Sequence, residues 1–509
     1  MSSLRSTSAA IVGLVWGAAA AAQAPLSAID WLSEVVVAPP AVEGPAAAGP
    51  VDRPEVSVTA LDAPRADAVG LLPMSVTGLP RGLWRASTAD ALIHRFDAIP
   101  ARSLPAIRSL HTTLLLAEAD PPPESGAEAR LLQARLAALR RSGAVEPALA
   151  LIERAGGDRP ALFDTWLDLA LLAGREGDAC AALAAAPDLS GEAGARIYCL
   201  ARAGDWPTAA LILRGAEASG AITEPDGTLL AGFLAPELID AGAPPRPPAE
   251  MTPLRFRLFE AVGATLDTRD LPRDYAIADL RGNAGWKAEI EAAERLAQTG
   301  ALPASRLFGL YTDRSPAASG GVWDRVAAVQ ALDRAIAQEA PGAVAATLPA
   351  AFEAAREMRL ETVYAEIFAE RLLAAAPLPD TVRASAVEMV LLSPLYERAS
   401  EIRAPGTARA RLLAGIAAGR PEARDAATPI ETAIADGFAA TSPAPEHRPL
   451  IASGRLGEAI LAAAAQLESG VAHAAPSALR AALSTLRATG LEETARRAAL
   501  QILLLEPHR

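Results

Sequence analysis

Apolar residues recur at three- and four-residue spacing along most of the chain from Ser87 onward, which predicts a succession of amphipathic helices. Ser87 or Thr88 can cap a first helix that carries Leu92 and Phe96, and a second stripe covers residues 104–117. Short breaks with Gly or Pro separate such stretches, and no segment between them has the pattern of a buried strand. We therefore predict an all-α fold in which helix, turn and helix alternate.

The predicted turns share a spacing in which alanine follows glycine by five residues. The pairs are Gly143 and Ala148, Gly177 and Ala182, Gly204 and Ala209, Gly454 and Ala459, and Gly490 and Ala495. Glycine accepts the positive φ that ends a helix, and alanine lets two helix backbones approach. In this spacing, clearest in RAGDWPTAALIL, the chain resembles the tetratricopeptide-type repeat, although the aromatic and leucine pattern of that family is absent. The resemblance implies helical hairpins that form an α-solenoid.

The amino end has the layout of a secretory signal peptide. MSSLRSTSAAIVGLVWGAAAAAQA begins with one positive charge at Arg5, continues through an apolar segment and ends in small residues that suit cleavage after Ala22. No later apolar run approaches the roughly 18 residues that a membrane-spanning helix needs. We expect residues 1–22 to be a signal peptide and the mature chain to be periplasmic, without a membrane span.

The two cysteines lie almost symmetrically about a predicted helix connection near residues 188 and 189. Cys180 falls in the helix before the connection and Cys199 in the antiparallel helix after it, so their positions along the helix axes differ by only about 1.5 to 3 Å at the helical rise per residue. Pairing is the default in an oxidising compartment. We predict a structural disulfide between Cys180 and Cys199, with two buried free thiols as the alternative.

Shifts in composition divide the chain into segments. Residues 23–85 are rich in Pro, Ala and Gly and lack a helical period, which predicts a flexible linker or a strap laid over the first helices. A Pro-rich linker is expected at residues 241–254. The predicted helical units are an N-terminal helical-repeat domain at 86–240, a middle helical domain at 255–376 and a C-terminal helical-repeat domain at 377–509.

Charge and motifs narrow the function classes. The formal net charge is −13 and no basic run interrupts it, so we expect no nucleic-acid partner. The five histidines are scattered, and there is no P-loop, dinucleotide fingerprint or Gly-x-Ser-x-Gly elbow, so we expect no metal, no cofactor and no enzymatic activity. One alternative is a cell-wall glycan-processing enzyme with an α-superhelical domain. Glu468 and Ser469 are similar to the Glu-Ser pair of lytic transglycosylases, but the other motifs of that family are missing.

The longest stretch without a helical period inside a helical context is residues 310–326, LYTDRSPAASGGVWDRV. Exposed Tyr, Trp and Arg are common interface anchors, and such loops often carry function. The candidate partner-surface residues are Tyr311, Asp313, Arg314, Trp323 and Asp324. A competing interpretation is that Trp323 begins the core stripe of the next helix. We predict a non-enzymatic, exported scaffold that binds an envelope or periplasmic protein.

A second alternative comes from residues 104–139, where a helix, a polar break and another helix follow the Pro-rich segment. This layout is similar to that of periplasmic motility proteins of alphaproteobacteria that associate with the flagellar stator. The resemblance implies a role in motility.

Overall fold

The computed structural model describes residues 65–126, 128–236, 246–375, 377–402 and 406–505. Over these residues the chain is helical and contains no β-strand; Leu72 and Ala117 form an isolated parallel bridge. The predicted all-α class is therefore confirmed. The predicted signal peptide lies outside the described residues. None of the helices in the described ranges combines the length and apolarity that crossing a membrane requires.

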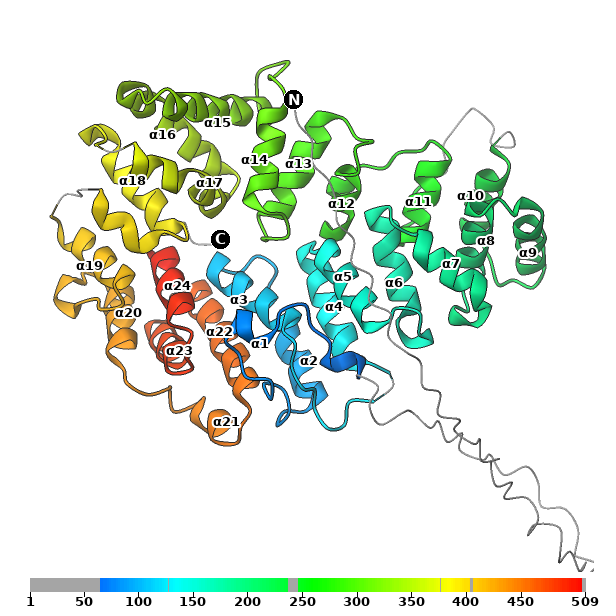
Figure 1. Ribbon diagram of the computed structural model, residues 1–509, viewed down its shortest axis with the longest axis horizontal. Coiled ribbons are helices and arrows are strands. Elements are labelled where there is room, and N and C mark those ends of the chain that lie inside the picture. Colours follow the sequence, from blue (N-terminus) through cyan, green and yellow to red (C-terminus); the bar gives the residue numbers. More distant parts are fainter. Residues whose placement is uncertain (1–64, 127, 237–245, 376, 403–405, 506–509) are drawn as a thin grey trace, which may run out of the picture. The chain divides into compact units, whose positions relative to one another are not determined.

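The first group of helices precedes the gap at residues 237–245 (Figure 1). Its elements are η1 (Ala66–Ala68), α1 (Met74–Thr77), α2 (Ala89–Asp97), α3 (Pro105–Leu116), α4 (Arg130–Ser142), α5 (Val145–Ala155), α6 (Pro160–Ala173), α7 (Gly177–Ala185), η2 (Pro187–Leu189), α8 (Ala193–Arg202), α9 (Trp206–Ala218) and α10 (Asp226–Leu234). Thr88 caps α2, as one of the two predicted alternatives, because its hydroxyl accepts the Ala91 N–H at 3.3 Å.

The second group follows that gap. Its elements are α11 (Pro253–Ala261), η4 (Thr268–Asp270), η5 (Arg273–Tyr275), α12 (Ala276–Asp279), α13 (Trp286–Ala297), α14 (Ala304–Asp313), α15 (Val322–Ala337), α16 (Pro341–Glu357), α17 (Glu361–Ala374), α18 (Asp380–Leu392), η6 (Tyr396–Glu401), α19 (Ala408–Ala417), η7 (Ala423–Asp425), α20 (Pro429–Ala439), α21 (Arg448–Ala452), α22 (Leu456–Ala472), α23 (Pro476–Ala488) and α24 (Glu492–Leu504). The predicted boundary at residue 377 falls between α17 and α18, whereas residue 240 lies outside the described residues, and Asp62–Arg509 forms one compact unit. The division into three helical domains stays a prediction.

Four of the five predicted turn glycines have the positive φ that the pattern requires: Gly143, Gly204, Gly454 and Gly490. Gly177 does not, because it is the first residue of α7. Gly174 ends α6 instead, with φ +70°. The turn glycines 143, 174 and 204 then lie 31 and 30 residues apart, a more even spacing than the 34 and 27 residues that separate Gly143, Gly177 and Gly204.

The predicted disulfide is confirmed. Cys180 on α7 and Cys199 on α8 are bonded, with an S–S distance of 2.02 Å and a Cα–Cα distance of 5.0 Å. The connection between the two helices contains η2, at the position that the symmetry argument requires. The bond therefore belongs to the helical hairpin as a structural element.

The described end of the Pro-rich segment, residues 65–85, packs against α3 and α4. Arg135 on α4 is buried and donates to four backbone carbonyls, at 2.6 Å to Leu115, 2.7 Å to Val69, 3.2 Å to Ala117 and 3.3 Å to Asp67. Trp84 is buried against α22 at Gly457, where a Cβ atom would lie 2.2 Å from the Trp84 ring. This part of the segment is therefore laid over helices from both ends of the unit.

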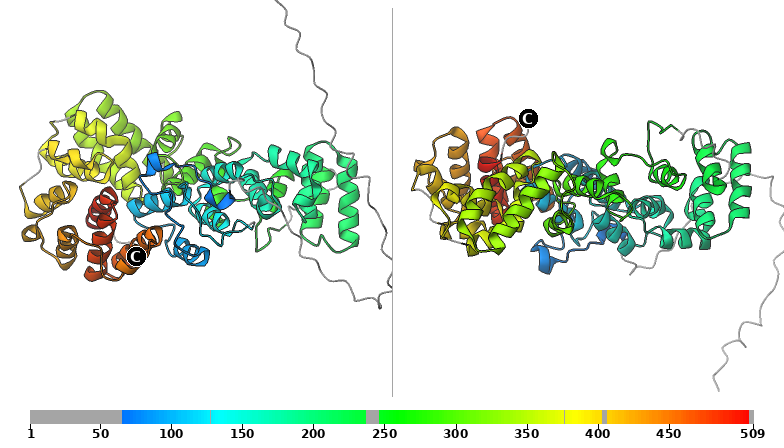
Figure 2. Two further views of the ribbon diagram at one scale, coloured as in Figure 1. Left: turned by 60° about the horizontal axis from the view of Figure 1, so that its bottom comes forward. Right: turned by 90° about the horizontal axis from the view of Figure 1, so that it is seen from above.

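The first and last helices of the unit also pack together directly. In Figures 1 and 2, α2 and α3 lie beside α22 and α24. Helix α2 contacts α22, and α3 contacts α24. Glu468 on α22 accepts the Leu104 N–H at 2.9 Å, and Gln501 on α24 accepts the Ala106 N–H at 2.8 Å. Because these N–H groups begin α3 and lack partners within that helix, the last helices supply its cap. An open solenoid has no such contact between its ends.

Candidate partner-binding cleft

A cleft of about 960 Å³ lies beside α11, α12 and α13, under the segment that joins α14 to α15. Its apolar part includes Trp286 at the start of α13 and Trp323 at the start of α15, whose ring centroids are 5.1 Å apart. The charged side chains that line it are Glu260, Asp267, Arg269, Asp279, Lys287, Glu291 and Arg314. The cleft thus combines two tryptophan rings with side chains of both charges, and we call these charged side chains the charged wall of the cleft.

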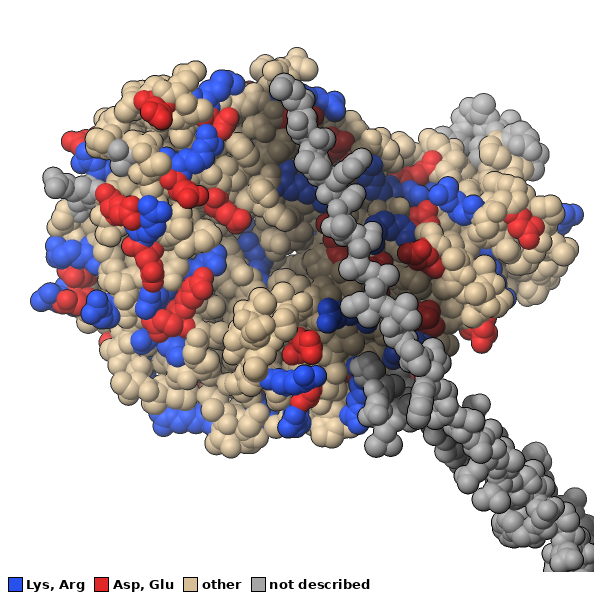
Figure 3. Space-filling view, viewed as in Figure 1, with Lys and Arg blue, Asp and Glu red and all other residues tan. Residues whose placement is uncertain are grey.

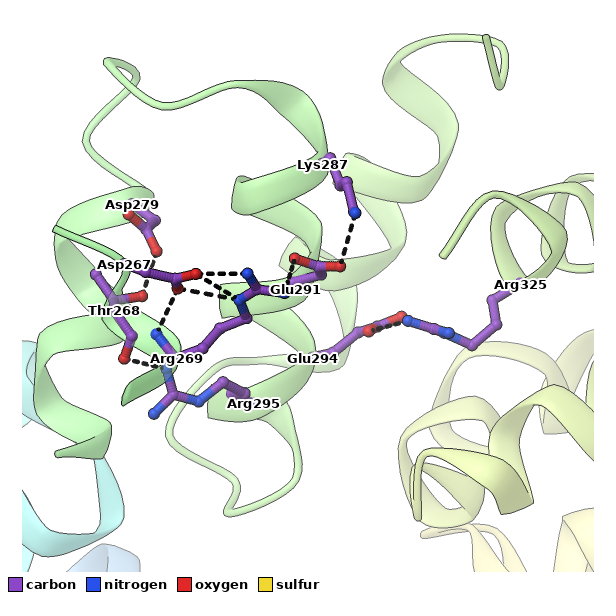
Figure 4. Close-up of polar contacts among 9 residues, drawn as sticks. All are labelled: Asp267, Thr268, Arg269, Asp279, Lys287, Glu291, Glu294, Arg295 and Arg325. Atoms are coloured by element: carbon purple, nitrogen blue, oxygen red, sulfur yellow. Dashed lines mark hydrogen bonds and ion pairs between the residues drawn. The ribbon is translucent and has the colours of Figure 1, made fainter. Parts of the chain in front are cut away.

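The charged wall is an ion-pair chain along α13 and the preceding loop (Figure 4). Arg269 Nε donates to both Asp267 carboxylate oxygens at 3.0 and 2.9 Å, and its NH1 lies 3.9 Å from Glu291. Lys287 Nζ lies 3.7 Å from Glu291. The hydrogen bond from Arg269 holds the pKa of Asp267 below its usual value. Arg269 and Lys287 are both well exposed, so these pairs contribute little to stability and can exchange partners with an incoming chain.

Asp279 is held more tightly than the exposed charged residues of the wall. Asp279 at the end of α12 accepts a hydrogen bond from the Thr268 hydroxyl at 2.5 Å, and burial raises the pKa of its carboxyl group. Arg295 on α13 donates to the carbonyls of Thr268 and Leu271 at 2.7 and 3.2 Å. These bonds fix the loop that carries Asp267 against α13.

Behind the wall, a buried polar network ties four helices together. Glu294 on α13 is fully buried and accepts two hydrogen bonds from Arg325 on α15, at 2.8 and 2.6 Å. The Tyr311 hydroxyl on α14 donates to the same carboxylate at 2.7 Å, and the Tyr364 hydroxyl on α17 donates to Tyr311 at 3.3 Å. Burial raises the pKa of Tyr311 well above its ordinary value. This network sets the spacing between the helices that carry Trp286 and Trp323.

The predicted partner-surface residues do not all lie at the surface. Tyr311 is fully buried in the network just described, because α14 continues to Asp313 and places Tyr311 on its inner stripe with Leu307. The irregular segment is therefore 314–321, shorter than the predicted 310–326.

The remaining four predicted residues lie at the two ends of segment 314–321. Asp313, Arg314 and Asp324 are exposed, while Trp323 is half-buried against Trp286. Arg314 Nε donates to Asp313 at 2.9 Å, and Asp324 accepts the Gly320 N–H at 2.9 Å. Of these four, Arg314 and Trp323 line the cleft.

The base of the segment is anchored to the helices. Gln330 on α15 donates to the carbonyls of Tyr311 and Arg314 at 2.8 and 2.7 Å, and the Trp286 indole N–H donates to the Leu310 carbonyl at 2.9 Å. Trp286 and Lys287, the single lysine of the chain, were not among the residues predicted from the sequence. Both residues lie more than twenty positions before segment 314–321, with α14 between, and no local pattern connects them to that segment.

Glu468, singled out by its similarity to a catalytic pair, has a structural position. It lies inside α22, which continues to Ala472, and a Cβ atom at Gly470 would lie 2.9 Å from Leu479 on the adjacent α23. Glu468 lines neither the cleft nor the cavities beside α3. Burial raises the pKa of its carboxyl group to about 7, against the opposing effects of the Leu104 N–H and of Arg108.

Within the described ranges, no three or more His, Cys, Asp or Glu side chains cluster closely enough to hold a metal ion. Over the face drawn in Figure 3, acidic and basic side chains are interspersed and do not gather into one patch of a single sign. Comparisons with protein-family models, with curated proteins and with solved structures found no match.

Proposed function

We propose that this chain is a non-enzymatic, exported scaffold that binds another protein in a bacterial periplasm or envelope complex, and that the cleft beside α13 is its docking site. The observation that carries the proposal is the pairing of Trp286 and Trp323 at a cleft whose rim bears Arg269, Lys287 and Arg314. Aromatic and arginine side chains are the commonest energetic anchors of protein interfaces.

The cleft is suited to binding because its walls are fixed before a partner arrives. Arg325 and Glu294 hold α15 to α13, and Gln330 and Trp286 fix the start of segment 314–321. Ordering a surface on binding costs free energy, so a surface already held in place loses less of it. The charged wall can attract a partner segment whose charges are complementary to it, and can set the register of that segment in the cleft.

The arrangement of hairpins supports a repeat architecture of the tetratricopeptide kind. Consecutive helices from α4 to α10 contact one another in chain order, and the turns at Gly143, Gly174 and Gly204 recur at even intervals. Ala148 and Ala209, which follow two of these turns, are fully buried. We propose that the hairpins from α4 to α10 are divergent solenoid repeats within a unit whose first and last helices pack together. The motility and glycan-processing functions remain alternatives, and no described contact favours either.

The proposal is tested by affinity capture from solubilised cell envelope with charge-reversal variants. Arg314→Glu changes an exposed residue of the cleft, and Arg398→Glu changes a matched exposed arginine that pairs with Glu401 far from the cleft residues. Reversing an interface charge costs several kcal/mol of binding, so we expect a defined envelope protein to be recovered by the unmodified chain and by Arg398→Glu, and at least about tenfold less by Arg314→Glu.

Equal recovery by all three chains would place the binding surface elsewhere. Cleavage of purified cell-wall glycan by the unmodified chain would overturn the scaffold proposal in favour of the enzymatic alternative.

A further inference from the structure

A second polar cavity lies where the beginning, middle and end of the described unit meet. It has a volume of about 290 Å³ and is lined by α3, by residues 297–304 between α13 and α14, by α17 and by Arg497 of α24. Two neighbouring cavities, of about 210 and 20 Å³, share Arg108 of α3 with it. Arg108 therefore lines all three cavities.

Hydroxyl groups and guanidinium groups dominate the polar lining of the 290 Å³ cavity. The hydroxyl-bearing residues are Ser109, Thr112, Thr113, Thr299 and Thr362, and the cations are Arg108 and Arg497. Glu366 is the acid of this lining, and it is exposed. The lining of the cavity is thus polar and carries a positive charge, although Thr113 and Thr299 already donate their hydroxyl groups to backbone carbonyls, at 2.9 Å to Ser109 and 2.6 Å to Ser142.

Both arginines have donors that the protein leaves unused. The Nε atoms of Arg108 and Arg497 are inaccessible to solvent and have no hydrogen-bond partner among the described residues. Arg108 donates through NH1 to the Ser103 carbonyl at 2.7 Å, and Arg497 NH1 lies 3.6 Å from the exposed Glu493. Because the two Nε atoms are inaccessible to solvent, a ligand in the cavity would contact the terminal nitrogens of these guanidinium groups, and both arginines line the cavity.

The surroundings of Arg108 are cationic beyond the cavity itself. Burial lowers the pKa of Arg108 to about 10; Glu468 opposes this effect and Arg273 adds to it. Glu468 is engaged with the Leu104 N–H, and Arg102 lines the adjoining 210 Å³ cavity. The local charge therefore favours an anion over a cation or a neutral group.

We propose that this cavity binds the oxyanion group, phosphate or carboxylate, of a small molecule. The planar guanidinium group presents paired N–H donors that match the oxygens of both groups, and threonine hydroxyls complete such sites. The volume is at the lower end for ligand pockets and suits a compact ligand. The bound anion would bridge α3 and α24, which are the first and last long helices to meet there. Ligand binding would therefore stabilise the contact between the two ends of the unit.

The test is isothermal titration calorimetry of the full chain with inorganic phosphate and, separately, with succinate, at constant ionic strength. We expect one equivalent of one of these probes to saturate the site, and the responding probe distinguishes phosphate from carboxylate chemistry. Arg497→Gln removes one guanidinium group and should raise the dissociation constant at least about tenfold. The matched control Arg398→Gln, an exposed arginine outside the cavity lining, should leave it unchanged.

Arg108→Gln should abolish binding of the probe if that variant folds. If it does not fold, the dissociation constant of Arg497→Gln alone tests the proposal. The proposal is overturned if neither probe saturates the unmodified chain by about 10 mM, or if Arg497→Gln binds as tightly as the unmodified chain. An equal response to chloride at the same ionic strength would likewise show only a general salt effect.

Discussion

Replacing Glu294 by leucine is expected to destabilise the protein by about 3 to 5 kcal/mol, the usual cost of removing one partner from a buried ion pair. The substitution leaves the Arg325 guanidinium, of which only 12% of the side chain is exposed, without a counter-charge, and it leaves the Tyr311 hydroxyl without an acceptor. The loss is measured as a decrease in the midpoint of thermal or urea-induced unfolding. Because Glu294 joins α13 to α15, the same variant should also weaken partner capture by the cleft.

The double variant Glu294→Leu with Arg325→Met separates charge from packing. It removes both charges together, so we expect much of the lost stability to return. Glu401→Ala is the surface control, since Glu401 pairs with Arg398 where both side chains are about half exposed, and it should change the stability little. A loss for Glu294→Leu no larger than for Glu401→Ala would show that the buried network does not hold the cleft together.

The contact between the two ends of the unit is expected to weaken as the pH rises. Burial raises the pKa of Glu468 from 4.5 to about 7, so the folded state binds this proton more tightly than the unfolded state. The contribution of Glu468 is therefore most favourable below about pH 4.5 and declines as the pH rises through 7, by about 3 kcal/mol in all. Unfolding midpoints at pH 5 and pH 8 measure this decline.

Glu468→Gln isolates the effect from other titrating groups. The amide oxygen can still accept the Leu104 N–H but carries no charge, so this variant should be more stable than the unmodified chain at pH 8 and should lose the Glu468 part of the pH dependence. Glu370→Gln, an exposed change, should keep the pH profile of the unmodified chain. If Glu468→Gln and Glu370→Gln have the same pH profile, Glu468 does not control the contact.

Local features of the fold follow from the sequence because neighbouring residues determine them. Thr88 caps α2 through a bond within one turn, and the positions of Cys180 and Cys199 about a short connection were sufficient to predict their pairing. Gly177 was misassigned as a turn because alanine is so frequent that a small residue follows almost any glycine at five positions. Gly174, three residues earlier, ends the helix instead.

The candidate site was harder to predict because it depends on contacts between distant segments. Tyr311 belongs to a stretch with Ser, Pro and Gly, yet α14 runs past it, and its acceptor is Glu294 on a different helix. Trp286 and the ion pairs of Asp267 reach the cleft from helices that precede segment 314–321. The capping of α3 by Glu468 joins residues 364 positions apart, a pairing that no periodicity encodes.

The most direct test of the account is site-specific photo-crosslinking in intact cells. A photoreactive residue is placed at Ala317, which is exposed and lines the cleft, and in a matched chain at Ala181, which is exposed on α7 outside the cleft. If the cleft is the docking site, irradiation yields one defined crosslinked protein from position 317 and none from position 181, and Arg314→Glu removes that product. Crosslinks of equal yield from both positions, or a product from position 317 that persists in Arg314→Glu, would contradict the claim that this cleft binds the partner.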